Sequence, residues 1–90
     1  MKAIVHKSEW GDADRTLIMG TDETLELSDN YTLGDLQFLV GGNIELVHYE
    51  GKHLIVNEEG RLKGLPLNLW ADNRGLHLVG NVVELEGFLN

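Results

Sequence analysis

Short apolar runs, separated by polar and glycine-containing stretches, recur along the first third of the chain, a pattern typical of β-strands. Residues 2–7, 16–19 and 24–27 form these runs, so we expect three short strands there. Ser8–Arg15 is polar and contains glycine, which indicates a loop, and Gly20-Thr21-Asp22 is expected to end the second strand. This part of the chain is therefore predicted to be strands joined by turns.

The periodicity then changes to that of an amphipathic helix. Thr32 is a favourable N-cap residue, and Asp35 stands three residues later, in the position of a capping box. Gly41 can adopt the left-handed conformation that commonly ends a helix. The apolar residues at helical spacing, which predict one buried face, are Leu33, Leu36, Leu39 and Val40. We therefore expect one packed helix over residues 32–40.

The clearest predicted β-hairpin joins residues 43–50 to residues 53–57. Gly51-Lys52 suits a two-residue type II′ turn, because glycine stands first, and this turn would pair Glu50 with His53. Alternation assigns one face of the hairpin to the core, and its residues are Val47, Tyr49, Leu54 and Val56. The other face carries both histidines beside further apolar residues, so we expect it to be partly covered.

The last third is predicted to hold a short helical turn and two strands. Gly64-Leu65-Pro66 interrupts any strand, because proline has no N–H to donate. One helical turn is expected at residues 67–72. Residues 76–79 and 82–85 are predicted as the last two strands, joined as a hairpin around Gly80-Asn81.

These elements indicate an α+β fold for the 90 residues. We predict a single small domain over residues 1–90, with a mostly antiparallel sheet, one packed helix and a short helical turn. A domain of this size gains core by association, so a homo-oligomer is compatible with the sequence.

The charge balance narrows the class of partner. Fifteen acidic residues against seven basic ones give a net charge of −8. Contacts with nucleic-acid phosphates need clustered Lys and Arg, so we expect no direct nucleic-acid binding. The same charge disfavours an anionic membrane surface. It suits a basic partner protein, including a nucleic-acid-binding groove in which acids take the place of phosphates, although such charge also serves solubility.

Composition limits the chemistry and the location. The chain has no cysteine, which excludes disulfides, thiolate catalysis and Cys-ligated metal sites. No apolar run approaches the roughly 20 residues that span a membrane. The N-terminal residues MKAIVHKSEW lack the apolar core and cleavage site of a signal peptide. We therefore expect a cytoplasmic protein with no membrane association.

From residue 36 onward, the chain carries a set of short motifs that together are more specific than any one alone. They are L-V-G-G, I-E, N-E-E-G, K-G-L-P-x-N and V-G-N-V-V, at Leu39–Gly42, Ile44-Glu45, Asn57–Gly60, Lys63–Asn68 and Val79–Val83. This set resembles an uncharacterised family, a domain of unknown function found in small proteins of phages, plasmids and other mobile elements. The resemblance implies a bacterial host and a shared fold, and it implies no established reaction.

One segment departs from this family pattern. Relatives commonly have a basic Asn-Arg-x-Ala segment after the proline, whereas this chain has Asn68-Leu69-Trp70-Ala71. A role for the basic residue therefore does not carry over to this chain.

Two segments supply candidate binding residues. Gly64 and Pro66 fix an irregular backbone, on which Asn68 either contacts a ligand or caps the short helix, and Trp70 either anchors a partner or fills the core edge. In N-E-E-G, an acid–base or Ca²⁺ role competes with a turn in which Asn57 or Glu58 caps backbone groups and Gly60 has positive φ. The binding candidates are Asn57, Glu58, Glu59, Lys63, Pro66, Asn68 and Trp70.

Candidates for catalysis are few. His48, Glu50 and His53 are expected on one hairpin face, which makes them the best metal-ligand candidates, although cross-strand His and Glu pairs also occur on ordinary sheet surfaces. Gly41-Gly42 follows a helix, whereas a phosphate-binding loop precedes one, so this segment is not predicted to bind phosphate. We expect no cofactor. No serine has a histidine partner at a spacing that suggests a catalytic triad.

Together these observations favour a non-catalytic accessory protein of a phage or mobile element. We expect it to bind a host or element-encoded protein and to act as an acidic inhibitor or regulator of host machinery. A binding module for a small, nucleotide-like ligand is the alternative. A metal-dependent enzyme is a third hypothesis, and its candidate residues are His48, Glu50, His53 or Glu58.

Overall fold

The structure is a computed structural model that describes residues 1–10 and 17–85. The described residues form one antiparallel sheet of five strands in the order β2-β1-β5-β4-β3. The strands are β1 Lys2–Trp10, β2 Leu17–Glu26, β3 Ile44–Tyr49, β4 Lys52–Asn57 and β5 Val82–Leu85. The helices are α1 Leu33–Val40 and α2 Leu69–Asp72. The predicted α+β fold, with a packed helix and a short helical turn, is confirmed.

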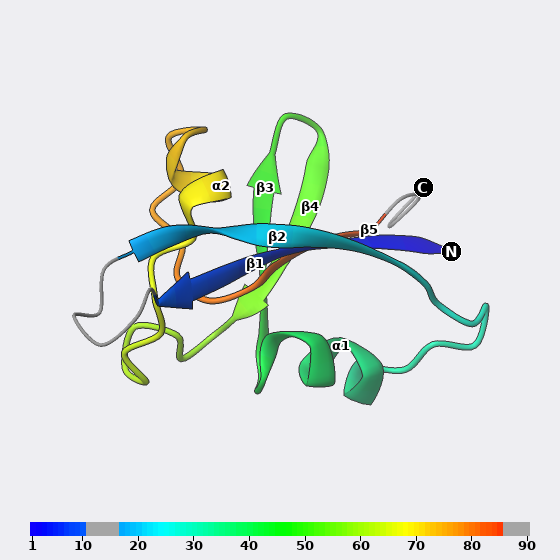
Figure 1. Cartoon of the computed structure of the whole chain (residues 1–90). Coiled ribbons are helices and arrows are strands. Elements are labelled where there is room, and N and C mark those ends of the chain that lie inside the picture. Colours follow the sequence, from blue (N-terminus) through cyan, green and yellow to red (C-terminus); the bar gives the residue numbers. More distant parts are fainter. Residues whose placement is uncertain (11–16, 86–90) are drawn as a thin grey trace.

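The two helices lie on opposite sides of the sheet (Figure 1). On the α1 side the buried cluster consists of Ala3, Val5, Leu36, Val40, Ile55, Val83 and Leu85. On the α2 side it consists of Leu54, Val56, Ala71 and Val82, with Trp70, Tyr49 and Val47 packed against it. The central strand β5 therefore contributes apolar side chains to both clusters, as expected for a strand covered on both faces.

Local signals place α1 as predicted. The Thr32 side chain accepts a hydrogen bond from the Asp35 N–H, and the Asp35 carboxylate accepts one from the Thr32 N–H, which completes the capping box. Gly41 ends the helix with φ of 79°. Leu36 and Val40 are buried beneath the helix.

The N-terminal strands are longer than predicted. Residues 16–19 and 24–27 were expected as separate strands, but β2 runs without a break from Leu17 to Glu26. The expected stop at Gly20 is a β-bulge, since the pairing with β1 shifts between His6 and Ser8. A Cβ on Gly20 would lie 1.8 Å from the Lys7 carbonyl oxygen, so glycine is needed for this close approach. Within the expected loop at residues 8–15, β1 extends to Trp10, and residues 11–16 lie outside the described residues.

The β3–β4 hairpin turns one residue earlier than predicted. Its loop is Glu50-Gly51, with φ of 48° and 76°, and Tyr49 pairs with Lys52. Positive φ at both loop residues is the requirement of a type I′ turn, so the expected type II′ turn and the Glu50–His53 pairing are wrong. The cross-strand partner of each β3 residue changes by two positions, so that Val47 pairs with Leu54 instead of Val56. Because the side-chain period of a strand is two, every residue stays on its predicted face. The predicted core face, Val47, Tyr49, Leu54 and Val56, is confirmed.

The predicted C-terminal hairpin is wrong. Val79 forms an isolated bridge with Leu67, and β5 pairs instead with β1 and β4 in the middle of the sheet. This pairing buries Val82 and Val83 completely, which a hairpin at the sheet edge would not achieve. The helical turn expected at residues 67–72 is shorter at its start, because Leu67 belongs to the bridge.

Asn68 connects these C-terminal elements. Its side chain is fully buried, and Oδ1 accepts a hydrogen bond from the Ala71 N–H as the N-cap of α2. Nδ2 donates to the carbonyl oxygens of His6 at 2.7 Å and Gly80 at 2.9 Å. One carboxamide therefore joins α2, β1 and the approach to β5, and its capping role, one of the two predicted readings, is confirmed.

We predict that Asn68→Ala lowers the free energy of unfolding by about 3 kcal/mol, because it removes an N-cap and leaves two carbonyl groups without their donor. Chemical denaturation followed by circular dichroism measures the change. Asn73→Ala is the matched control: Asn73 is exposed and the change should stay within about 0.5 kcal/mol. Equal denaturation midpoints for the two variants would contradict this role of Asn68.

Candidate functional site

Asn57 organises the turn that follows β4. Its side chain is buried, with Nδ2 donating to the Val40 carbonyl at 3.0 Å and Oδ1 accepting from the Glu59 N–H at 2.8 Å. The predicted capping of backbone groups by Asn57 is confirmed. The positive φ predicted for Gly60 is wrong. Glycine is needed there because a Cβ would lie 2.7 Å from a Val79 side-chain carbon.

This turn forms one wall of a pocket of about 210 Å³. The other lining residues come from β3, from β4 and from the segment that leads to β5. Its apolar lining comprises Val56, Leu62, Leu78 and Val79, and its ionisable lining comprises Glu45, Glu58, Arg61 and His77, with Asn57 and Gly60 between them. Leu62 is 88% exposed, so its side chain stands at the open rim.

The ionisable side chains of this pocket differ in whether they have hydrogen-bond or ion-pair partners. Arg61 Nη2 donates to the His77 carbonyl oxygen, and the His77 ring lies 3.4 Å from a carboxylate oxygen of Asp72. Glu45 and Glu58 are exposed, and within the described part of the chain neither carboxylate has a hydrogen-bond or ion-pair partner. The pocket lining therefore combines apolar side chains with two carboxylates able to accept hydrogen bonds from a cation.

The remaining predicted binding residues have other positions. Glu59 and Lys63 share the turn, and Lys63 Nζ donates to the Gly41 carbonyl at 3.4 Å. Pro66 is buried, and its carbonyl accepts from the Gly80 N–H. Of the seven predicted residues, the structure places only Asn57 and Glu58 in the lining of the pocket.

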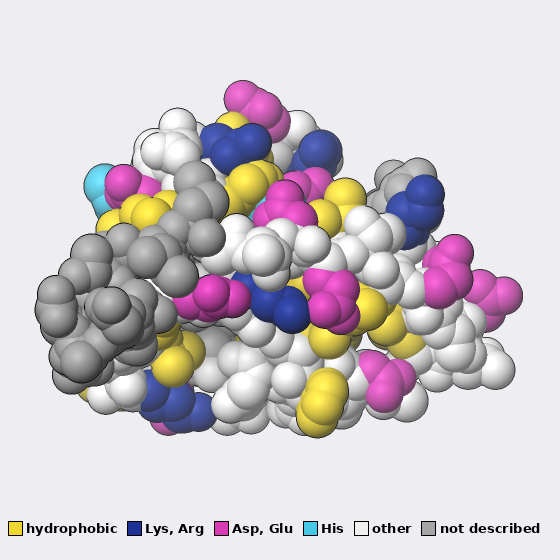
Figure 2. Space-filling model, viewed as in Figure 1, with side chains coloured by type: hydrophobic (Ala, Val, Ile, Leu, Met, Phe, Trp, Pro, Cys, Tyr) yellow, Lys and Arg dark blue, Asp and Glu magenta, His cyan; other side chains and the backbone are white. Residues whose placement is uncertain are grey.

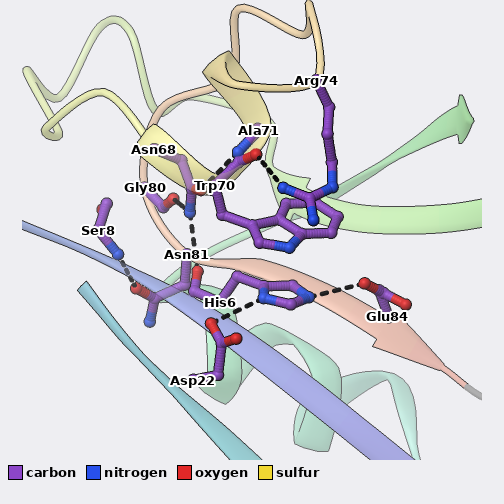
Figure 3. A network of polar contacts seen from close by, with 10 residues as sticks. All are labelled: His6, Ser8, Asp22, Asn68, Trp70, Ala71, Arg74, Gly80, Asn81 and Glu84. Carbon is purple, nitrogen blue, oxygen red and sulfur yellow. Dashed lines mark hydrogen bonds and ion pairs between the residues drawn. The ribbon is translucent and has the colours of Figure 1, made fainter. Parts of the chain in front are cut away.

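A second group of polar side chains surrounds His6 on the α2 side of the sheet (Figure 3). The ring is 5% exposed, with Nδ1 2.8 Å from an Asp22 oxygen and Nε2 2.7 Å from a Glu84 oxygen. The Trp70 indole stacks on it at a centroid distance of 3.7 Å and an angle of 11°. The Arg74 guanidinium lies 4.2 Å from the indole centroid, so Trp70 is held between two nitrogen-rich groups.

The chemistry of this group indicates a structural role. Two hydrogen bonds, one from each ring nitrogen to a carboxylate, require two protons between these groups. Either the ring carries both protons, or the ring carries one and a carboxyl group carries the other. His6 is therefore fully engaged and offers no free nitrogen to a substrate. Trp70 packs against the core edge as one of its two predicted readings states, and the stack attaches α2 to β1 and β5.

Sequence reasoning did not find this second group. His6 and Asp22 are 16 residues apart, and His6 and Glu84 are 78 apart, so no local spacing links them. Only the placement of β1 between β2 and β5 brings the three side chains together. Glu45, Arg61 and His77 in the pocket were missed for the same reason, whereas Asn57 and Glu58 were found through the N-E-E-G motif.

A comparison with known protein families identifies the domain. The family described as a domain of unknown function, DUF3846, matches residues 15–87, which is most of the chain. The chain belongs to the DUF3846 family. The match spans the whole pocket and omits β1, which supplies His6. No curated protein and no solved structure matches the sequence.

The predicted metal candidates of this DUF3846 chain are only partly brought together. His48 and His53 pair across β3 and β4, with ring centroids 4.2 Å apart and a tilt of 41°. Glu50 lies in the turn beyond them. Within residues 1–10 and 17–85, no group of three His, Asp or Glu side chains is placed to hold a metal ion. The same residues contain no helix that is long and apolar enough to cross a membrane.

We predict that His6→Leu destabilises the DUF3846 domain by about 2 kcal/mol, because Glu84, only 16% exposed, loses its nearest partner and the stack on Trp70 is lost. Adding Glu84→Leu should recover part of the loss, since no carboxylate then remains buried at that position. Urea denaturation at neutral pH measures both changes.

His77→Leu is the control, because His77 is 78% exposed and its ion pair with Asp72 lies at the surface. Its midpoint should match that of the unmodified chain. A His6→Leu midpoint equal to that of the control would show that the His6 group does not stabilise the fold.

Proposed function

We propose that this chain is a non-catalytic accessory protein of a mobile element that binds a basic partner protein, of the host or of the element, in the bacterial cytoplasm. The observation that supports it best is the pocket, which Glu45 and Glu58 line together with apolar residues, neither carboxylate having a partner among the described residues. The mobile-element setting rests on the motif resemblance.

A lysine or arginine side chain of a partner fits the chemistry of this pocket. Its aliphatic stem can lie along Leu78 and Val79, and its cationic head can reach the carboxylates of Glu45 and Glu58. Leu62, at the exposed rim, adds an apolar contact of the kind that surrounds a buried anchor in protein interfaces.

In this proposal the net charge speeds association with the basic partner, and the pocket makes the binding specific. A charge of −8 attracts a basic surface over a distance and raises the association rate at low salt. Figure 2 shows acidic side chains spread over the viewed face, with lysines and arginines among them, and no continuous acidic patch. A local anchoring site therefore explains recognition of the partner better than a uniformly acidic face does. If this chain covers a basic site on a protein of the host machinery, that site is inhibited.

A small anionic, nucleotide-like ligand is the second candidate. It is favoured by Arg61 and His77 in the same pocket, because the Arg61 guanidinium has further N–H donors beyond the one on the His77 carbonyl. In this case the phosphate would contact Arg61 and His77, and Glu45 and Glu58 would repel it.

We predict that a short peptide of alternating leucine and lysine shifts amide NMR signals around the pocket in a saturable manner. Adenosine monophosphate is the probe for the second candidate. Shifts at residues 45, 56–62 and 77–79 with the peptide alone support the basic partner, and shifts with the nucleotide alone support the anionic ligand. If neither probe perturbs these residues, the pocket serves neither function.

Neutral variants then test the carboxylates. Glu45→Gln with Glu58→Gln should lower peptide affinity at least about tenfold, because two charge-assisted hydrogen bonds are lost. Glu23→Gln with Glu26→Gln is matched in net charge but lies on β2, at the other edge of the sheet, and should change affinity little. Equal losses in the two pairs would mean that overall charge, and not the pocket, determines binding.

A further inference from the structure

Among the described residues the sheet has two open edges, β2 and β3, and they differ in composition. Strand β2 carries Asp22, Glu23 and Glu26 within five residues and contains the bulge at Gly20. Charge and bulges are devices that prevent an edge strand from pairing with another chain. Strand β3 has one acid, Glu45, no lysine, no proline and no bulge in its pairing with β4. It also carries Leu46, which is 46% exposed.

At this edge the backbone of β3 presents N–H and C=O groups that no other strand of the described residues pairs. The Glu58 N–H donates to the Asn43 carbonyl at 2.8 Å, so these two residues form a hydrogen-bonded pair directly next to the Ile44–Asn57 pair that ends the β3–β4 ladder. Because such pairs alternate in an antiparallel ladder, odd-numbered residues of β3 bond to β4. Ile44, Leu46 and His48 therefore direct their N–H and C=O groups away from β4, where the described residues place no further strand.

We propose that this edge is the interface with a second copy of the same chain. Two β3 strands would lie antiparallel about a two-fold axis at Leu46, so that the two sheets become continuous. Leu46 would pair with the partner's Leu46. Ile44 would pair with the partner's His48, and His48 with the partner's Ile44. These three pairs exchange about six backbone hydrogen bonds in total.

The side chains are self-complementary in this register. Glu45 faces the partner's Val47, and Glu50 falls opposite the partner's Gly42, so no two carboxylates stand directly opposite each other. Leu46 meets its own copy at the axis, which removes exposed apolar surface from water. This is the isologous arrangement of the commonest homodimers.

Neighbouring registers are less favourable. An axis at Glu45 would put that carboxylate opposite the partner's Glu45. An axis at Val47 would require Ile44 to pair with the partner's Glu50, whose φ of 48° belongs to a turn and cannot continue a strand. The axis at Leu46 is therefore the register with the most hydrogen bonds and no charge conflict.

The dimer would also place two pockets on one surface. A two-fold axis perpendicular to the sheet keeps equivalent faces on the same side, so both copies of the pocket would face the same direction. A partner with two basic segments could then bind both, with the gain in avidity that linked sites give. The dimer itself does not depend on the proposed function, since its contacts are made by the strand edge.

Sedimentation velocity of the full chain over a series of concentrations tests the proposal. We expect a species of twice 10.1 kDa at high concentration. Leu46→Lys should shift this species to the monomer, because it brings two ammonium groups together at the axis. Leu62→Lys, which changes an exposed leucine outside β3, should leave the dimer intact. A monomer at every concentration overturns the proposal. The β3 edge would then be a site for an extended segment of another protein.

Cysteine cross-linking tests the register without relying on the charged variant. The chain has no cysteine, so Leu46→Cys introduces a single thiol. Across the axis the two Cα atoms would lie about 5.5 Å apart, within the range that a disulfide bridges. Under mild oxidation this variant should form a covalent dimer. His48→Cys should not form this covalent dimer. In the proposed register the two introduced thiols would be four residues apart along the strand, a distance of roughly 13 Å.

Equal cross-linking of Leu46→Cys and His48→Cys overturns the two-fold register. A dimer that survives Leu46→Lys in folded protein, with folding checked by circular dichroism, overturns the β3 interface altogether. If Leu46→Lys does not fold, selective cross-linking of Leu46→Cys supports the proposal, and its absence overturns it.

Discussion

The fold depends on the buried carboxamide of Asn68. The chain reaches this residue after the Leu67–Val79 bridge, and Asn68 then starts α2 while its Nδ2 holds the backbone of β1 and of Gly80. These bonds fix where the segment before β5 leaves the bridge and enters the sheet. Since β5 is the central strand, the same side chain helps to place β1 beside it, and β4 pairs with its other side. A buried polar group with all its hydrogen-bonding groups satisfied specifies one arrangement among several apolar alternatives.

The pocket and the His6 group both follow from this arrangement. The bridge places Val79 against Gly60, which has no side chain to prevent the contact, and the turn after β4 then forms a wall of the pocket. On the same side of the sheet, α2 holds Trp70 over His6, so the imidazole that binds Asp22 and Glu84 is shielded from water. Polar contacts between elements far apart in sequence thus reinforce a small core in which no disulfide is present.

Features set by neighbouring residues could be predicted from the sequence, and features set by long-range pairing could not. The caps of α1 and the core face of the hairpin depend on spacings of one to four residues, and Thr32, Asp35 and Gly41 were each placed correctly. The turn at Glu50 was misplaced because a non-glycine residue has positive φ there. The hairpin expected around Gly80 was wrong because its apolar strand gains more burial between β1 and β4. For the pocket, the N-E-E-G motif identified Asn57 and Glu58, whereas Arg61 and His77 lie together only after the chain has folded.

The alternation of β3 lets a single strand serve the pocket and the proposed interface without conflict. Glu45 bonds through its backbone to β4 and carries its side chain on the pocket side, so it contributes a carboxylate and no edge group. Leu46 has the opposite arrangement, with its backbone at the open edge and its side chain on the face that α1 covers in part. A change at Glu45 should therefore act on the pocket, and a change at Leu46 on the edge, although the two residues are adjacent. This separation follows from the two-residue period of a strand, in which neighbouring side chains point to opposite faces and neighbouring backbone groups point to opposite edges.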